Sequence, residues 1–214
     1  MIRSTLHAQH PRSAHAAMAW GLMVAAGLAA LGTAQAAPAT RFEPAAQVAD
    51  SALLLNGAGT RYRAVFKAYD LALYLPRKAG TPEAVIAMPG AKRLYFTALR
   101  DLPGTDLGLA FVKGLQANAT ADQVQRHMTS ATRLIEIFSG KAKLVAGDTF
   151  AMDYLPGRGT QFFIKGEPQG APVGDAEFFQ MVLRIWLGSS PVDAQLKDAL
   201  LGQEPRAAHV SPGL

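Results

Sequence analysis

The stretch from Gly57 to Leu75 constrains the fold and the chemistry of this chain more than any other segment. It reads GAGTRYRAVFKAYDLALYL and is dominated by residue types that favour β-strands. Side chains two positions apart on a strand share a face. Three cations and one phenol occupy such alternating positions: Arg61, Arg63, Lys67 and Tyr69. Because a strand that only packs on a core carries apolar side chains there, this pattern indicates a binding surface.

The composition is that of one globular domain. The chain has 214 residues, of which 50% are hydrophobic and 17% are charged, and this balance excludes a disordered chain. The formal charge of +5 falls to about +3 if Arg3 and Arg12 are removed with the N-terminal segment. A charge this small and scattered argues against a nucleic-acid partner. The absence of cysteine excludes disulfides and thiol chemistry.

The N-terminus has the layout of a cleavable secretory signal. Arg3 and Arg12 precede an apolar run over residues 16–31, and Ala34-Gln35-Ala36 is a small-x-small cleavage pattern. The run is shorter than the ~20 apolar residues that a membrane span prefers. We therefore expect cleavage after Ala36, a periplasmic location and no membrane span in the mature protein; an uncleaved anchor is the alternative.

Local signals predict strands at both ends of the domain. Residues 41–43 could pair as an edge strand, and Asn56-Gly57 is a hairpin-turn signal before a strand over residues 62–75. Alternation predicts a strand over residues 91–99, with Leu94, Phe96 and Ala98 on one face. Two further strands are expected over residues 148–154 and 160–164.

Helices are predicted in the middle and at the C-terminal end. Thr81-Pro82 starts a short helix, helical spacing begins at Leu107, and Thr120 caps a helix through residue 138. An apolar helix over 177–187 and a helix over 192–201, capped by Ser190-Pro191, complete the set. This order indicates an α+β fold, one large antiparallel sheet with a layer of helices on one face.

The segment 57–75 also resembles the opening hairpin of the chalcone isomerase superfamily, in which a Gly-x-Gly-x-Arg sequence leads to a strand ending in Tyr-Leu. The segments 147–167, 177–188 and 190–202 resemble later parts of its bacterial, envelope-directed branch. The resemblance covers residues 52–202 and implies an open-faced sandwich with a ligand cleft between sheet and helices. The predicted organisation is a signal over 1–36, an extended arm over 37–51, the domain over 52–202 and a tail over 203–214.

The resemblance implies that Arg61 holds a ketone and its developing enolate in isomerases, or a carboxylate in the fatty-acid-binding relatives. A permanently charged, planar donor fork suits both roles. Tyr69 falls where the plant enzymes have a threonine, and a tyrosine at this point together with the arginine resembles the fatty-acid-binding members more closely. The hairpin is shorter than the family's, so Arg63 is an alternative to Arg61. Without the family, Arg61 would be read as a surface arginine or as the partner of Asp70 or Asp153.

Other family positions imply an apolar cleft. Leu107 falls where the plant enzymes have a helix tyrosine, and Phe179 replaces a hydroxyl or amide. The family's strand lysine corresponds to Lys92 or Arg93. We include Lys92, Thr97 and Phe179 with Arg61, Arg63 and Tyr69 as ligand-binding candidates, and Arg61 and Tyr69 as catalytic candidates. A more apolar cleft suits an acyl chain better than a polyphenol.

Three functions therefore compete. The first is an exported binding protein for a small apolar carboxylate or carbonyl ligand. The second is a chalcone-flavanone-type isomerase that needs no cofactor or metal, and the third is a non-catalytic envelope interaction module. Loss of the helix tyrosine favours the first over the second. The sequence leaves the natural ligand, the pathway and the oligomeric state open.

Overall fold

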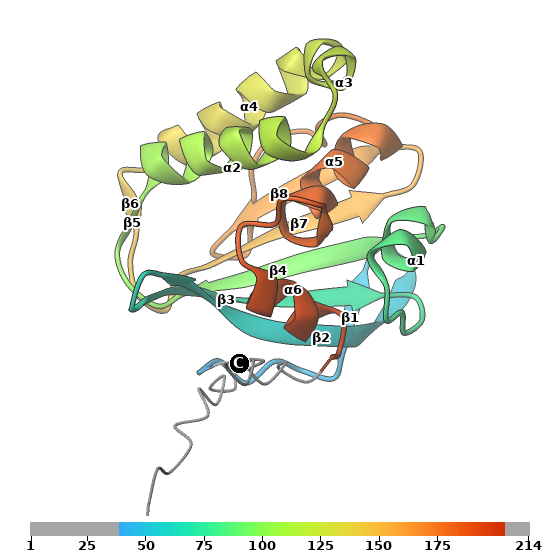
Figure 1. Ribbon diagram of the computed structural model, residues 1–214. Coiled ribbons are helices and arrows are strands. Elements are labelled where there is room, and N and C mark those ends of the chain that lie inside the picture. The colour runs from blue at the N-terminus through green and yellow to red at the C-terminus, as the bar shows by residue number, and fades with distance from the viewer. Residues whose placement is uncertain (1–38, 204–214) are drawn as a thin grey trace, which may run out of the picture. The chain divides into compact units, whose positions relative to one another are not determined.

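Seven strands form an antiparallel sheet in the order β1-β2-β3-β4-β7-β8-β9 (Figure 1). Buried and partly exposed side chains alternate along β4, as expected for a strand with one face in the core. The computed structural model describes residues 39–203. The strands of this sheet are β1 (Ala45–Val48), β2 (Ser51–Arg63), β3 (Phe66–Leu75), β4 (Lys92–Ala98), β7 (Thr149–Leu155), β8 (Gly159–Ile164) and β9 (Glu167–Pro168). A second, two-stranded sheet joins β5 (Leu102–Pro103) to β6 (Lys143–Leu144).

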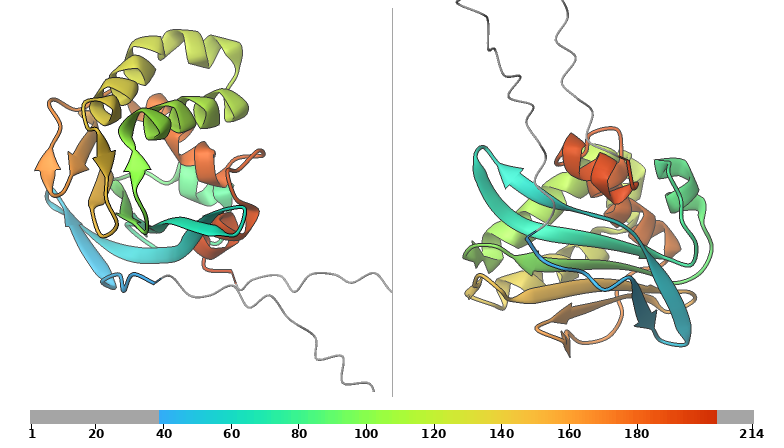
Figure 2. Two further views of the ribbon diagram at one scale, coloured as in Figure 1. Left: turned by 90° about the vertical axis from the view of Figure 1, so that its left-hand side faces the viewer. Right: turned by 90° about the horizontal axis from the view of Figure 1, so that it is seen from below.

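Helices cover one face of the curled sheet, which confirms the predicted α+β sandwich (Figures 1 and 2). The helices are α1 (Pro82–Ala87), α2 (Gly104–Asn118), α3 (Ala121–Arg126), α4 (Met128–Ser139), α5 (Ala176–Leu187) and α6 (Ala194–Leu200). Helix α5 is buried nearly all round, as its apolar sequence predicts. Its side chains and the inward residues of β3, β4, β7 and β8 form the main core.

A smaller core lies on the other face of the sheet. There Val48, Leu53 and Tyr74 are buried, and the Phe42 ring meets the edge of the Tyr95 ring at 6.3 Å between centroids. The N-terminal arm therefore covers this face. Its edge strand is Ala45–Val48, so the strand expected over residues 41–43 lies a few residues later.

The β2–β3 hairpin turns at Ala64-Val65 and not at the predicted Asn56-Gly57. Strand β2 continues through Asn56 and Gly57 to Arg63. The amide group of Asn56 has tertiary partners instead: it donates to the carbonyls of Ala79 and Leu200 and accepts from the Ala79 amide. These buried hydrogen bonds outweigh the local turn preference.

A bulge near the tip of this hairpin separates Lys67 from the other predicted face residues. Arg61 pairs with Tyr69, but the register then shifts and Tyr62 pairs with Lys67. Since neighbours along β2 point to opposite faces, Lys67 leaves the face that Arg61 and Tyr69 share.

Two helix boundaries differ from the sequence-based expectation. The predicted helix over 120–138 is broken at His127 into α3 and α4. The last helix begins at Ala194 and not at Val192, because the Asp193 carboxylate, and not Ser190-Pro191, accepts from the first-turn amides of Gln195 and Leu196. By contrast, the Thr81 cap and the Pro82 start of α1 are as predicted.

Candidate functional site

Arg61 and Tyr69 lie directly opposite each other on β2 and β3. Tyr69 in turn pairs with Ala98 of β4, which belongs to the main core under the helices. Side chains of directly paired residues share a face of the sheet. The structure thus places the two catalytic candidates side by side on the helix-covered face.

The Arg61 guanidinium is held by a carboxylate from the last helix. Its Nη1 lies 3.2 Å from Oδ2 of Asp193, and it also donates to the Tyr62 carbonyl. The same Oδ2 accepts from the Tyr62 amide at 3.3 Å. The side chain of Arg61 is 24% exposed and that of Asp193 is 12% exposed, so the ion pair lies at the border between solvent and the protein interior.

The phenol of Tyr69 is neutral and is held by a hydrogen bond from helix α5. Nε1 of Trp186, on α5, donates to its oxygen at 3.0 Å. Burial raises the pKa of Tyr69 to about 12, against the smaller opposing effects of the Trp186 hydrogen bond and the Arg61 charge. Because Trp186 occupies one acceptor position, the phenolic proton is left to be donated elsewhere.

Aromatic side chains fill the space between this pair and the helices. The rings of Phe96 and Phe150 stack at 4.0 Å between centroids, and Tyr69 meets the edge of Phe96 at 5.4 Å. On the helix side, Phe111 of α2 and Trp186 of α5 cover these rings, and their own ring centroids are 5.7 Å apart. The arginine–tyrosine pair therefore lies at the margin of an apolar, aromatic interior.

Two glycines let α6 lie directly on β2. A Cβ at Gly57 would stand 2.1 Å from the Ala199 carbonyl oxygen, and one at Gly59 would stand 2.8 Å from the Ala199 Cβ. The close approach brings the N-terminus of α6, with Asp193, to Arg61. The Gly-x-Gly-x-Arg sequence thus works as a packing surface for α6 and not as a turn.

Lys92 belongs to a second cluster on the same face. It is 4% exposed, its Nζ donates to the Met88 carbonyl and lies 5.5 Å from the centre of the Tyr154 ring. Tyr154 stacks on Phe179 of α5 at 5.0 Å. Burial lowers the pKa of Lys92 to about 8. Two ligand-binding candidates, Lys92 and Phe179, therefore flank one tyrosine.

Family and structural comparisons agree with this architecture. The model of a family described as chalcone isomerase-like matches residues 34–202. The chain belongs to the chalcone isomerase-like family. Among solved structures, a fatty-acid-binding protein from Arabidopsis thaliana is similar with a TM-score of 0.57 and 14% sequence identity, over 75% of this chain and 90% of that one. A search of curated proteins finds no match.

In this chalcone isomerase-like protein, two further ligand-binding candidates contribute less to the site around Arg61. Arg63 lies two residues further along β2 and is exposed at the hairpin end, opposite Phe66. Thr97 pairs with Asp70 and alternates with the buried Phe96, so it faces the side of the sheet that the helices do not cover. Of the two arginines, Arg61 is the less exposed one and the one that binds Asp193.

The two family positions that carry apolar residues in this chalcone isomerase-like chain are both in the core. Leu107 is 7% exposed and Phe179 is 1% exposed. The anticipated partners of Arg61 are also engaged elsewhere: Asp70 accepts from Thr60, and Asp153 forms a double hydrogen bond with Arg93 at 2.6 Å.

The sequence-based interpretation of this chalcone isomerase-like chain missed the site roles of Asp193 and Trp186. Asp193 caps α6 and also binds Arg61, 132 residues away in the sequence. A Trp N–H on an otherwise apolar helix needs a polar partner, and this need is the sequence signal that could have indicated a hydrogen-bonding role for Trp186.

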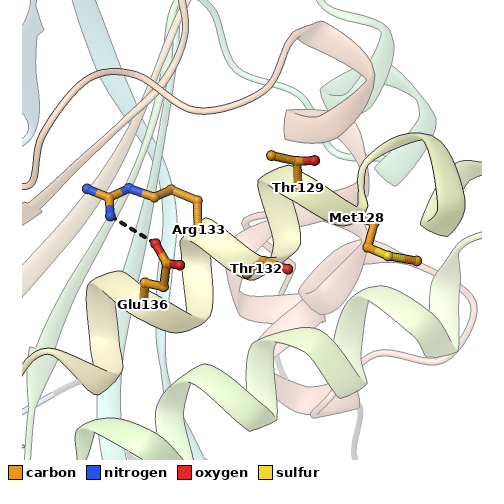
Figure 3. Close-up of a pocket in the computed structure, with 5 residues that line it drawn as sticks. All are labelled: Met128, Thr129, Thr132, Arg133 and Glu136. Carbon is orange, nitrogen blue, oxygen red and sulfur yellow. Dashed lines mark hydrogen bonds and ion pairs between the residues drawn. The ribbon is translucent and has the colours of Figure 1, made fainter.

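Two shallow depressions of the chalcone isomerase-like domain lie outside this site, along α4. The first is lined by five exposed residues of α4, and Arg133 and Glu136 form an ion pair across it at 3.0 Å (Figure 3). Its lining residues are Met128, Thr129, Thr132, Arg133 and Glu136. Since the buried face of α4 is formed by Leu134, Ile137 and Phe138, this depression is on the outside of the helix layer.

Proposed function

We propose that this protein binds a small apolar carboxylate, or a carbonyl compound of similar shape, with Arg61 as the anchor of the polar group. The observation that carries the proposal is the carboxylate already bound to Arg61, that of Asp193, at 3.2 Å. It stands where a ligand carboxylate would stand. A partly exposed ion pair contributes little net stability, so a ligand can replace it at small cost.

Tyr69 supports the same role. Its hydroxyl proton is free of the Trp186 hydrogen bond and lies beside Arg61, so a ligand oxygen there could accept from both groups. With a pKa near 12 the phenol stays protonated at neutral pH and acts as a donor.

The apolar part of the ligand would lie against the aromatic layer. Phe96 and Phe150 are almost completely buried and directly adjoin Tyr69. These side chains fill the layer in the structure, so binding requires α2 and α5 to move apart from the sheet or the rings to change rotamer. An acyl chain is thin and flexible enough for such a space, whereas a polyphenol needs polar partners that Leu107 and Phe179 do not offer.

An isomerase that stabilises an enolate with Arg61 is the second candidate. A fixed cation beside a developing oxyanion is a large catalytic effect, and the ring closure is intramolecular. General-acid groups typically contribute ~10²–10⁴-fold, and the family's helix tyrosine is Leu107 here. We therefore expect weak or absent chalcone cyclisation, measured as decay of chalcone absorbance.

Export to the periplasm by a signal cleaved after Ala36 is part of the proposal and lies outside the described residues. Membership of an envelope-directed branch of the family would follow from it. In the described part of the chain no helix is both long and apolar enough to cross a bilayer. The intact mass of protein recovered from the periplasm tests cleavage, and a mass that includes residues 1–36 would contradict it.

The direct test of ligand class is native mass spectrometry of the protein as purified. The proposal predicts a bound acidic lipid-like molecule that is lost in Arg61→Gln and retained in the exposed-site control Arg158→Gln. If neither carboxylates nor chalcones bind to the purified protein, the interaction-module function takes their place.

A further inference from the structure

The tip of the β2–β3 hairpin exposes apolar side chains where a polar turn would be ordinary. Val65 is 82% exposed and Phe66 is 61% exposed. Two-residue hairpin turns are normally built from Asn, Asp or Gly, but this turn is Ala64-Val65. Ala64 even takes a positive φ of 52°, which favours glycine or asparagine. Folding alone therefore does not account for these residues.

Cations surround this apolar tip. Arg63 and Lys67 flank it along the chain and are both exposed. Arg100, which follows β4, lies over the Phe66 ring with its Cζ at 5.5 Å from the ring centre. The hairpin lies at the same end of the sheet as β5 and β6 (Figure 1).

Two acidic side chains near this end are paired with lysines. Asp101 binds Lys143 at 2.5 Å, and Asp148, whose carbonyl accepts from Ala98 at the end of β4, binds Lys165 at 2.9 Å. Within residues 39–203, none of Arg63, Lys67 and Arg100 forms an ion pair. Three cations without an ion-pair partner therefore lie next to two exposed apolar residues.

We propose that this hairpin docks on the surface of a lipid bilayer rich in anionic headgroups. Val65 and Phe66 enter the interface, while Arg63, Lys67 and Arg100 meet the headgroup phosphates. Exposed apolar side chains ringed by cations are the combination that interfacial binding uses. A two-residue apolar tip is too small for a stable protein interface, which buries about 800 Å² on each partner. An acidic protein partner is therefore the less favoured occupant.

Vesicle flotation of the full chain tests the proposal, with phosphatidylglycerol-containing vesicles against pure phosphatidylcholine. Each cation near an anionic surface contributes about a fivefold factor in affinity. Arg63→Gln should therefore weaken binding to the anionic vesicles about fivefold, and raised salt should weaken it further. The matched control is Arg158→Gln, which removes an exposed arginine from the turn between β7 and β8 at the other end of the sheet and should leave binding unchanged.

A local probe separates the hairpin from any contribution of residues 1–36. The indole introduced by Phe66→Trp should be quenched by brominated phosphatidylglycerol beyond the quenching of the unsubstituted protein. Leu109→Ser, at an exposed apolar position of α2, is the apolar control for Phe66→Ser. Equal flotation of Phe66→Ser, Arg63→Gln and wild type, or an unquenched indole, would overturn the proposal. Because no carboxylate ligand is added, this outcome is independent of the proposed ligand site.

Discussion

Asp193 binds Arg61 with the same carboxylate that caps helix α6. One oxygen accepts from the Gln195 and Leu196 amides, and the other receives Nη1 of Arg61 at 3.2 Å. The position of the helix and the orientation of the candidate anchor are thereby coupled. Since Gly57 and Gly59 allow α6 to reach β2, the motif that precedes Arg61 in sequence also decides which carboxylate meets it in space.

Gly57→Ala should destabilise the protein by forcing α6 away from β2. The added Cβ would meet the Ala199 carbonyl oxygen at 2.1 Å, a distance that requires the backbone to shift. Overpacking of this kind costs typically 1–3 kcal/mol in the free energy of unfolding, measured by urea titration. Gly80→Ala is the control, because a Cβ there meets no atom within 4 Å. Equal stability of both variants would show that the close packing of α6 is unimportant.

Ionised Glu177 should stabilise the folded protein, and this contribution should be lost in acid. Hydrogen bonds from Arg126, Gln123 and His127 lower the pKa of Glu177 to about 2, from an ordinary 4.5. A lowered folded-state pKa means that its contribution is complete above pH 4.5 and is lost as the pH falls toward 2. The difference in unfolding free energy between wild type and Glu177→Gln should shrink over this window. A difference that stays constant from pH 6 to pH 2 would contradict the assignment.

Charged Lys92 should destabilise the folded protein at neutral pH, and this penalty should disappear in alkali. Its pKa of about 8 lies below the ordinary 10.5, so folding disfavours the charged form, and the penalty is present below pH 8 and disappears by pH 10.5. At neutral pH Lys92→Met should therefore raise the free energy of unfolding by about 2–3 kcal/mol, because the fall in pKa corresponds to at most about 3.5 kcal/mol and solvent screening reduces this. The gain should vanish near pH 10.5. Lys113→Met, at an exposed position of α2, should show no such pH dependence.

Local patterns were sufficient for most elements of the fold. The alternation of Leu94, Phe96 and Ala98 predicted the inward face of β4, and Thr81-Pro82 predicted the start of α1. Both signals act over a few residues, so the sequence alone contains them. The α+β class followed from their order.

Long-range contacts account for what the sequence did not reveal. The Asn56-Gly57 turn signal was wrong because Asn56 bonds to Leu200, 144 residues away. The prediction that Arg61, Arg63 and Lys67 share one face of the hairpin was wrong, because a bulge moves Lys67 to the other face. The cap of the last helix is Asp193 and not the predicted Ser190-Pro191, and no local pattern indicates that Asp193 also meets Arg61.

Calorimetric titration with hexadecanoate measures whether Arg61 binds a ligand carboxylate in exchange for that of Asp193. Arg61→Gln should weaken binding roughly tenfold or more, because a charged hydrogen bond contributes about 1.5–3 kcal/mol. Asp193→Asn keeps a capping oxygen but frees Arg61, and it should tighten binding about two- to fivefold. Arg63→Gln should leave the affinity unchanged. Wild-type affinity in Arg61→Gln, an equal loss in Arg63→Gln, or weaker binding in Asp193→Asn would show that Arg61 does not anchor the ligand in place of Asp193.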